Sequence, residues 1–144
     1  MFADFLRKLT APDPAPLVDD EARLALAALL VRLARADGDY AAIEIAQIDR
    51  TLSDRFGISP FESVALRAEA EVLEAEAPDT VRFTRAIKDA VPHDDRLSVV
   101  EAMWRVVLAD GERDDHEDSN MRMISNLLGI TDRESALARQ KASG

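Results

Sequence analysis

The clearest candidates for chemistry are acidic residues in two copies of one short loop. Each copy reads Ala-Asp-Gly and has a Glu seven positions after the Asp, which gives the pairs Asp37 with Glu44 and Asp110 with Glu117. Carboxylate and carbonyl oxygens are the ligands that Ca²⁺ and Mg²⁺ prefer. A loop can bring two such side chains together, and packing of the two copies about an approximate twofold axis would unite all four. The pattern predicts a divalent cation site, for Ca²⁺ or Mg²⁺ rather than Zn²⁺.

The two loops belong to a longer internal repeat. The segment LVRLARADGDYAAIE at 30–44 matches MWRVVLADGERDDHE at 103–117 without a gap. After one deleted residue, Phe-Gly-Ile-Ser at 56–59 matches Leu-Gly-Ile-Thr at 128–131. We therefore predict a duplicated helix–loop–helix unit in which each second helix ends at a Gly-Ile pair.

A purely structural interpretation of the same residues stays open. Gly38 and Gly111 stand where a helix ends, a position that commonly requires a left-handed backbone. Glu44 and Glu117 fall in the first turns of the following helices, where the helix dipole favours negative charge. On this interpretation the acids close a helical hairpin without a cation. The second loop nevertheless holds six acids within the nine residues 110–118, and like charges at this density repel unless they are solvated, neutralised or bound to a cation.

Helical periodicity runs along most of the chain, and no segment shows sustained apolar–polar alternation. This predicts an all-α, single-domain bundle of about seven helices. In the helix that begins at Pro60, the spacing of Phe61, Val64, Ala68 and Val72 predicts an inward face. Asp, Ser-Pro, Pro and Gly signals delimit the expected helices. These cover about 19–38, 41–56, 60–77, 79–91, 93–111 and 115–128, with a helical tail from 131.

Composition bounds the class of protein. A chain of 144 residues suits one domain, and we assign 1–18 to a short amphipathic helix with a Pro-rich linker and 19–144 to the helical domain. The net charge of −10 argues against binding to nucleic acid, which needs clustered Lys and Arg. No stretch approaches the roughly 20 apolar residues of a transmembrane helix. A cytoplasmic location is therefore expected.

No residue pattern indicates catalysis. The chain has no cysteine, no Gly-rich phosphate loop and no nucleophile elbow. We expect His93 to be exposed near a helix start, His116 to lie in a solvated acidic loop, and Trp104 to lie in the core. The protein is therefore not predicted to be an enzyme.

The duplicated Ala-Asp-Gly helix ends, each followed by a Glu, resemble the tellurite-resistance TerB-like family, whose relatives also occur beside DnaJ-type co-chaperone modules. The resemblance covers about 19–131. It implies an all-helical fold, a bacterial origin, and metal binding through the acidic loop residues, which here are Asp37, Glu44, Asp110 and Glu117. It also implies a non-catalytic role in stress-response complexes at the inner face of the membrane.

The alternative function is a metal-free acidic module that recruits a protein partner, either basic or membrane-associated. The sequence does not identify that partner or the oligomeric state. The acids of the helix from Pro60 are most simply its solvated face, and docking of a basic partner is the other interpretation. These acids are Glu69, Glu71, Glu74 and Glu76.

Overall fold

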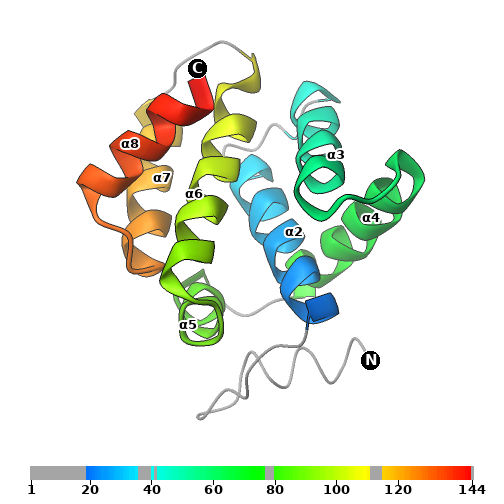
Figure 1. The fold of residues 1–144 in the computed structure, drawn as a ribbon, viewed down its shortest axis with the longest axis horizontal. Helices are drawn as coiled ribbons and strands as arrows, with labels where there is room; N and C mark the ends of the chain where they lie inside the picture. The colour runs from blue at the N-terminus through cyan, green and yellow to red at the C-terminus, as the bar shows by residue number, and fades with distance from the viewer. Residues whose placement is uncertain (1–18, 36–39, 41, 77–79, 111–114, 144) are drawn as a thin grey trace.

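Seven α-helices and one short 3-10 helix make up the described part of the chain, which confirms the predicted all-α fold (Figure 1). The computed structural model describes residues 19–35, 40, 42–76, 80–110 and 115–143. The N-terminal helix and linker expected at 1–18 lie outside these residues. The elements are α2 (Asp19–Arg35), α3 (Ala42–Phe56), α4 (Pro60–Glu76), α5 (Thr80–Ala90), α6 (His93–Val107), η1 (Leu108–Asp110), α7 (Asp115–Leu127) and α8 (Asp132–Ser143).

The helices form two halves, and each half consists of three consecutive helices that pack in the same way. The first half is α2–α3–α4 and the second is α6–α7–α8, with α5 between them in the chain. Helix α2 makes its most extensive contacts with α4, α6 makes its own with α8, and α2 also packs against α6. In Figure 1, α3 and α4 lie on the right, α7 and α8 on the left, and α2 and α6 between them. This arrangement agrees with the predicted duplication.

The second helix of each half ends in the same way. Gly57 follows α3 with φ 62°, and Gly129 follows α7 with φ 78°, so both adopt the left-handed conformation that favours glycine. In each case the amide of the next residue, an Ile, donates to the carbonyl oxygen of a Ser five positions earlier, at 3.2 Å for Ser53 and 2.9 Å for Ser125. This is the six-to-one bond of a Schellman motif. The predicted Gly-Ile helix ends are confirmed.

The third helix of each half begins with a capping box. The Ser59 hydroxyl accepts the Glu62 amide at 3.1 Å, and the Glu62 carboxylate accepts the Ser59 amide at 3.2 Å. Thr131 and Glu134 form the same reciprocal pair at 3.1 and 3.0 Å. Each box satisfies two amides that the helix itself leaves without partners. Local sequence therefore sets where α4 and α8 start.

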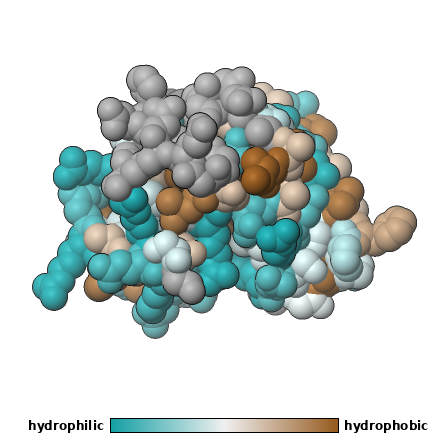
Figure 2. Space-filling model, turned by 90° about the horizontal axis from the view of Figure 1, so that it is seen from above, coloured by the Kyte–Doolittle hydropathy of each residue, from teal (hydrophilic) through white to brown (hydrophobic). Residues whose placement is uncertain are grey.

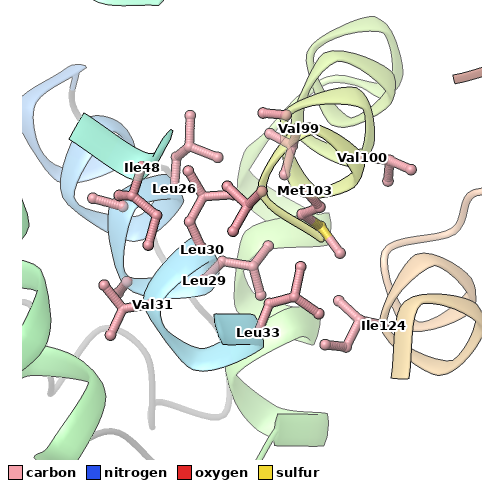
Figure 3. Packing of buried hydrophobic residues seen from close by; sticks show 14 of the residues in the cluster. Leu26, Leu29, Leu30, Val31, Leu33, Ile48, Val99, Val100, Met103 and Ile124 are labelled. Atoms are coloured by element: carbon pink, nitrogen blue, oxygen red, sulfur yellow. The ribbon is translucent and has the colours of Figure 1, made fainter. Parts of the chain in front are cut away.

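Helix α2 is buried on almost every side. Each residue from Ala25 to Val31 is at most 5% exposed. A helix that is apolar all round belongs in the centre of a bundle, and its alanines let neighbouring helices approach closely. Figure 3 shows Leu29 and Leu30 of α2 near Met103 of α6, and Ile124 of α7 beside Leu33. One core thus joins the two halves.

The predicted inward face of α4 is wrong. Phe61 is 90% exposed, Val64 45% and Val72 54%, and Ala68 is exposed as well. Helix α4 has apolar residues on both sides, so its periodicity alone could not identify the face that packs against α2. Small side chains on the opposite side allow the close contact that the structure shows. The buried residues of α4 are Ser63, Ala70 and Leu73.

Candidate functional site

The first repeated loop leads into α3, and the structure describes one of its two predicted ligands. Asp37 lies outside the described residues. Glu44 lies in the first turn of α3, as predicted, and is only 5% exposed. A buried carboxylate needs compensating interactions, and Glu44 interacts with a neighbouring group of the protein. The Glu44 side chain is therefore packed inside the protein at the start of α3 and is not a free surface carboxylate.

The second repeated loop begins beside the same helix. The 3-10 helix η1 ends at Asp110 and packs against α3, which carries Glu44. Glu117 belongs to the first turn of α7. The structure describes the backbone at Asp110 and Glu117 but not their side chains. It thus brings the start of the second loop next to the helix that follows the first.

The donor chemistry of the four acids suits a hard cation, because all four offer carboxylate oxygens. Within the residues that the structure describes, no group of three or more His, Cys, Asp or Glu side chains is arranged to hold a metal ion. Three of the four predicted ligands, Asp37, Asp110 and Glu117, fall outside the side chains on which that finding rests. None of the described helices is long and apolar enough to cross a bilayer.

At the contact between α2 and α4, two arginines of α2 form ion pairs with one glutamate of α4. Arg35 Nη1 lies 2.8 Å from Glu74 Oε2, and Arg32 Nε lies 3.4 Å from Glu74 Oε1. The Glu74 side chain is 14% exposed. Both arginines also donate to backbone carbonyls of α4, at 3.3 Å for Arg32 and 3.4 Å for Arg35. The interpretation of Glu74 as a solvated acid is therefore wrong, because it pairs across the helix interface.

A second ion-pair group joins α3 to α4. Arg67 Nε lies 2.6 Å from Asp49 Oδ1, and Arg67 Nη1 lies 3.3 Å from Glu71 Oε1. All three side chains are at most 25% exposed. Glu71, like Glu74, thus faces partners on the protein rather than solvent, while Glu69 and Glu76 are exposed as predicted.

Tyr40 links this polar network to the first repeated loop. It lies two residues before Ala42, the first residue of α3, and the Arg35 guanidinium lies 5.1 Å from the centre of its ring. Burial, and next the neighbouring Glu71 carboxylate, raises the pKa of Tyr40 to about 12. The described end of the loop is therefore held against α2 and α4. The sequence signal for this group was the pair of arginines in the last turn of α2.

In the second half, the contact between α6 and α8 centres on Trp104. Its side chain is 6% exposed, which agrees with the predicted core position. The indole Nε1 donates to Ser135 Oγ at 3.1 Å, and Ser125 Oγ lies 3.5 Å from the same oxygen. Arg139 stacks over the ring at 5.0 Å from its centre. A buried indole needs such a partner for its N–H, so this group is structural.

An open groove of about 770 Å³ runs between α3, α6 and the end of α8. Charged side chains of both signs line it, and Glu101 on its wall binds Arg105 at 3.0 Å. Its serines Ser98 and Ser143 donate to backbone carbonyls of their own helices, as serines inside helices commonly do. Among the described residues, the groove has no hydroxyl group placed beside a base.

His93 is exposed at the start of α6, as predicted, and its Nε2 lies 3.1 Å from a Glu134 carboxylate oxygen.

These features define a class of protein, a duplicated all-α bundle whose two halves each contain an Ala-Asp-Gly sequence followed by a Glu. The family model described as tellurite resistance protein TerB matches residues 23–140. The chain therefore belongs to the TerB family, as its repeated motifs had indicated.

One solved structure supports the same fold. A protein of unknown function from Porphyromonas gingivalis superposes with a TM-score of 0.67 and 20% sequence identity, over 94% of this chain and 96% of that chain. At this identity the likeness concerns the fold alone. No protein of curated function matches the sequence significantly.

Proposed function

We propose that this TerB-family protein is a non-catalytic binding protein whose two repeated loops together hold a divalent cation, Ca²⁺ or Mg²⁺ in preference to Zn²⁺. The ligands would be Asp37, Glu44, Asp110 and Glu117. The observation that supports this is the packing of η1, at the start of the second loop, against the helix that carries the buried Glu44. A cation held there would tie the two halves together at their loops. The protein would act in a bacterial stress-response complex, in the cytoplasm or peripherally at the inner membrane.

Calorimetric titration of the full chain with Ca²⁺, Mg²⁺, Mn²⁺ and Zn²⁺ tests the cation. We expect heat of binding and a rise in Tm, since a ligand at a hundred times its Kd adds about 2.7 kcal/mol to the free energy of unfolding. Asp37→Asn and Asp110→Asn should weaken both effects. Asp89→Asn, an exposed acid on α5, is the matched control. If none of the four ions at millimolar concentration gives heat of binding or a change of Tm, cation binding is refuted.

The second candidate is a metal-free adaptor in which the loops are purely structural and an acidic surface recruits a partner. The side of α4 that faces away from α2 favours it, because the apolar Phe61, Val64 and Val72 and the acidic Glu69 and Glu76 are all exposed on this helix. On this hypothesis the carboxylates of Asp37 and Asp110 hold the loops closed. Asp37→Asn and Asp110→Asn therefore lower the Tm even in buffer that contains a chelator. Unchanged stability of both variants in chelator, together with binding of metal by the unmodified chain, would decide against it.

A further inference from the structure

The outward face of α4 is an apolar stripe. Phe61, Val64 and Val72 are its large side chains, and they are 90%, 45% and 54% exposed. At 100° per residue, these positions fall within a stripe about 100° wide, the width of a face that a helix normally buries. In Figure 2, apolar side chains reach the surface on the right, the side on which α4 lies in Figure 1. The exposed alanines that fill the stripe are Ala65, Ala68 and Ala75.

No other described helix exposes apolar residues in this way. Of the seven large hydrophobic residues exposed in the described structure, α4 carries three, while α3, α5, α7 and α8 carry one each. Single exposed hydrophobic residues are ordinary, but several on one helix face mark an interaction site. Helix α4 is apolar on two sides, and the other described helices cover only one of them.

The duplication supplies an internal comparison. Helix α8 holds the position in the second half that α4 holds in the first, because the capping boxes of Ser59 and Thr131 correspond. The positions of α8 that match Phe61, Val64, Ala65 and Ala68 are Arg133, Ala136, Leu137 and Gln140, so α8 has one large apolar side chain there where α4 has two. The fold therefore does not require an apolar stripe at this place, and the stripe is particular to α4.

An acidic edge runs along the stripe. Glu62, Glu69 and Glu76 are spaced by seven residues, so they line one side of it, and all three are exposed. Glu69 and Glu76 form no ion pair with any residue that the structure describes. Arg67 is the only cation in the α4 sequence; its side chain is 15% exposed and already paired. The charge that α4 presents beside its apolar stripe is therefore negative.

We propose that the outward face of α4 docks a basic amphipathic helix of a partner protein. The apolar side of that helix would cover Phe61, Val64 and Val72, and its Lys or Arg side chains would lie beside the acidic edge. This combines seam packing with flanking charge pairs, as in helix–helix recognition generally. The inference does not depend on cation binding, and it gives the adaptor hypothesis its surface and its class of partner.

Charge decides against a second copy of the chain as the occupant. In a twofold antiparallel pairing centred on Glu69, Glu62 of one copy would meet Glu76 of the other, and the two Glu69 side chains would face each other. Like charges opposed along a helix seam destabilise the pairing. The same acids would repel an anionic lipid surface. A cationic helix gains at each of these positions.

The test uses the full chain and a synthetic peptide. The probe is a helical Leu–Lys peptide of about 18 residues, five turns, with Leu at heptad seam positions. A scrambled peptide of the same composition and a Leu–Glu peptide of the same pattern serve as controls. We expect the Leu–Lys peptide alone to bind, with an affinity that falls as salt rises.

Substitutions on α4 locate the binding. Phe61→Ser should weaken it by about ten-fold or more, because the lost contact is a large apolar side chain. Leu137→Ser, at a half-exposed residue on α8, is the matched control and should leave the affinity unchanged. The double variant Glu69→Gln, Glu76→Gln should weaken binding and flatten its salt dependence. Asp54→Asn with Asp89→Asn, exposed on α3 and α5, controls for net charge. Circular dichroism checks that each variant is folded.

The possible outcomes separate this inference from the adaptor hypothesis. No binding of any peptide would overturn both. Binding that survives Phe61→Ser and the double Glu variant would keep an acidic adaptor but overturn the assignment to α4. Equal binding of the Leu–Glu peptide would refute the charge argument. A dimer in sedimentation that Phe61→Ser dissolves would make a second copy the occupant. An increase in peptide affinity caused by Phe2→Ser with Phe5→Ser would make the N-terminal segment of the chain the occupant.

Discussion

The two helix-ending glycines offer a matched test of the structure. Gly57 and Gly129 occupy equivalent places in the repeat, and both have positive φ. Their surroundings differ. A Cβ added at Gly57 would meet nothing within 4 Å, whereas one at Gly129 would lie 2.9 Å from Arg96 Nη1 and 3.0 Å from Lys88 Cε. Substitution by Ala should therefore cost the same backbone strain at both sites and an additional contact at only one.

The magnitudes follow from these contacts. A left-handed backbone costs an L-residue about 1–2 kcal/mol, so Gly57→Ala should lower the free energy of unfolding by that amount. Gly129→Ala must also displace Arg96, whose Nη1 donates to the Leu128 carbonyl at 2.7 Å. A hydrogen bond from a charged donor contributes about 1.5–3 kcal/mol. Because the arginine is flexible and recovers part of this, we expect a total loss of about 2–4 kcal/mol for Gly129→Ala.

Urea unfolding followed by far-UV circular dichroism measures both losses. The additional cost at Gly129 should disappear when Gly129→Ala is combined with Arg96→Ala, because the displaced hydrogen bond is then already absent. Equal losses for the two glycine variants would refute the reasoning. So would an additional cost that persists in the Arg96→Ala background.

Three further predictions concern the polar groups. Glu74→Gln should lower the free energy of unfolding by about 1–3 kcal/mol, because two arginines lose their partner; the exposed Glu76→Gln should change it by less than about 0.5 kcal/mol in the same urea assay. The phenolate absorbance of Tyr40 should titrate in the folded protein near the raised pKa of about 12. Since the folded protein keeps this proton where the unfolded chain has lost it, stability falls as pH rises from about 10 towards 12, and Tyr40→Phe should flatten that part of the profile. Ser135→Ala should lower the free energy of unfolding by about 1–3 kcal/mol, because the Trp104 indole N–H loses its buried partner, and thermal unfolding measures the loss.

Helix limits and the repeat were predictable because their causes are local. The glycines at 57 and 129 and the Ser or Thr two residues later act on their own neighbours, so the sequence pattern identified where helices end and begin. The orientation of α4 was not predictable in this way. Its two faces are both apolar, and the contact with α2 selects the one with Ala70 and Leu73.

The ion pairs between α2 and α4 could not be predicted from the sequence for a related reason. The pair of arginines at the end of α2 is visible in the sequence, but its partners are not, because the hydrogen bonds from Arg32 and Arg35 to α4 join residues 36 to 42 positions apart in the chain. For the acidic loops, local signals correctly placed Glu44 in the first turn of α3. Its burial and the approach of η1 to that helix depend on how the two halves pack, which spacing along the chain does not encode.

The chain contains a single tryptophan and a single tyrosine, and they lie in different halves. Trp104 sits against α8 through Ser135 and Arg139, and Tyr40 sits beside Arg35 at the end of α2. Each half thus has its own intrinsic chromophore, so indole fluorescence follows the second half and tyrosine absorbance the first. Because α2 and α6 share one core, the two signals should change at the same urea concentration. The duplicated protein therefore reports, without a label, whether its halves unfold as one cooperative unit.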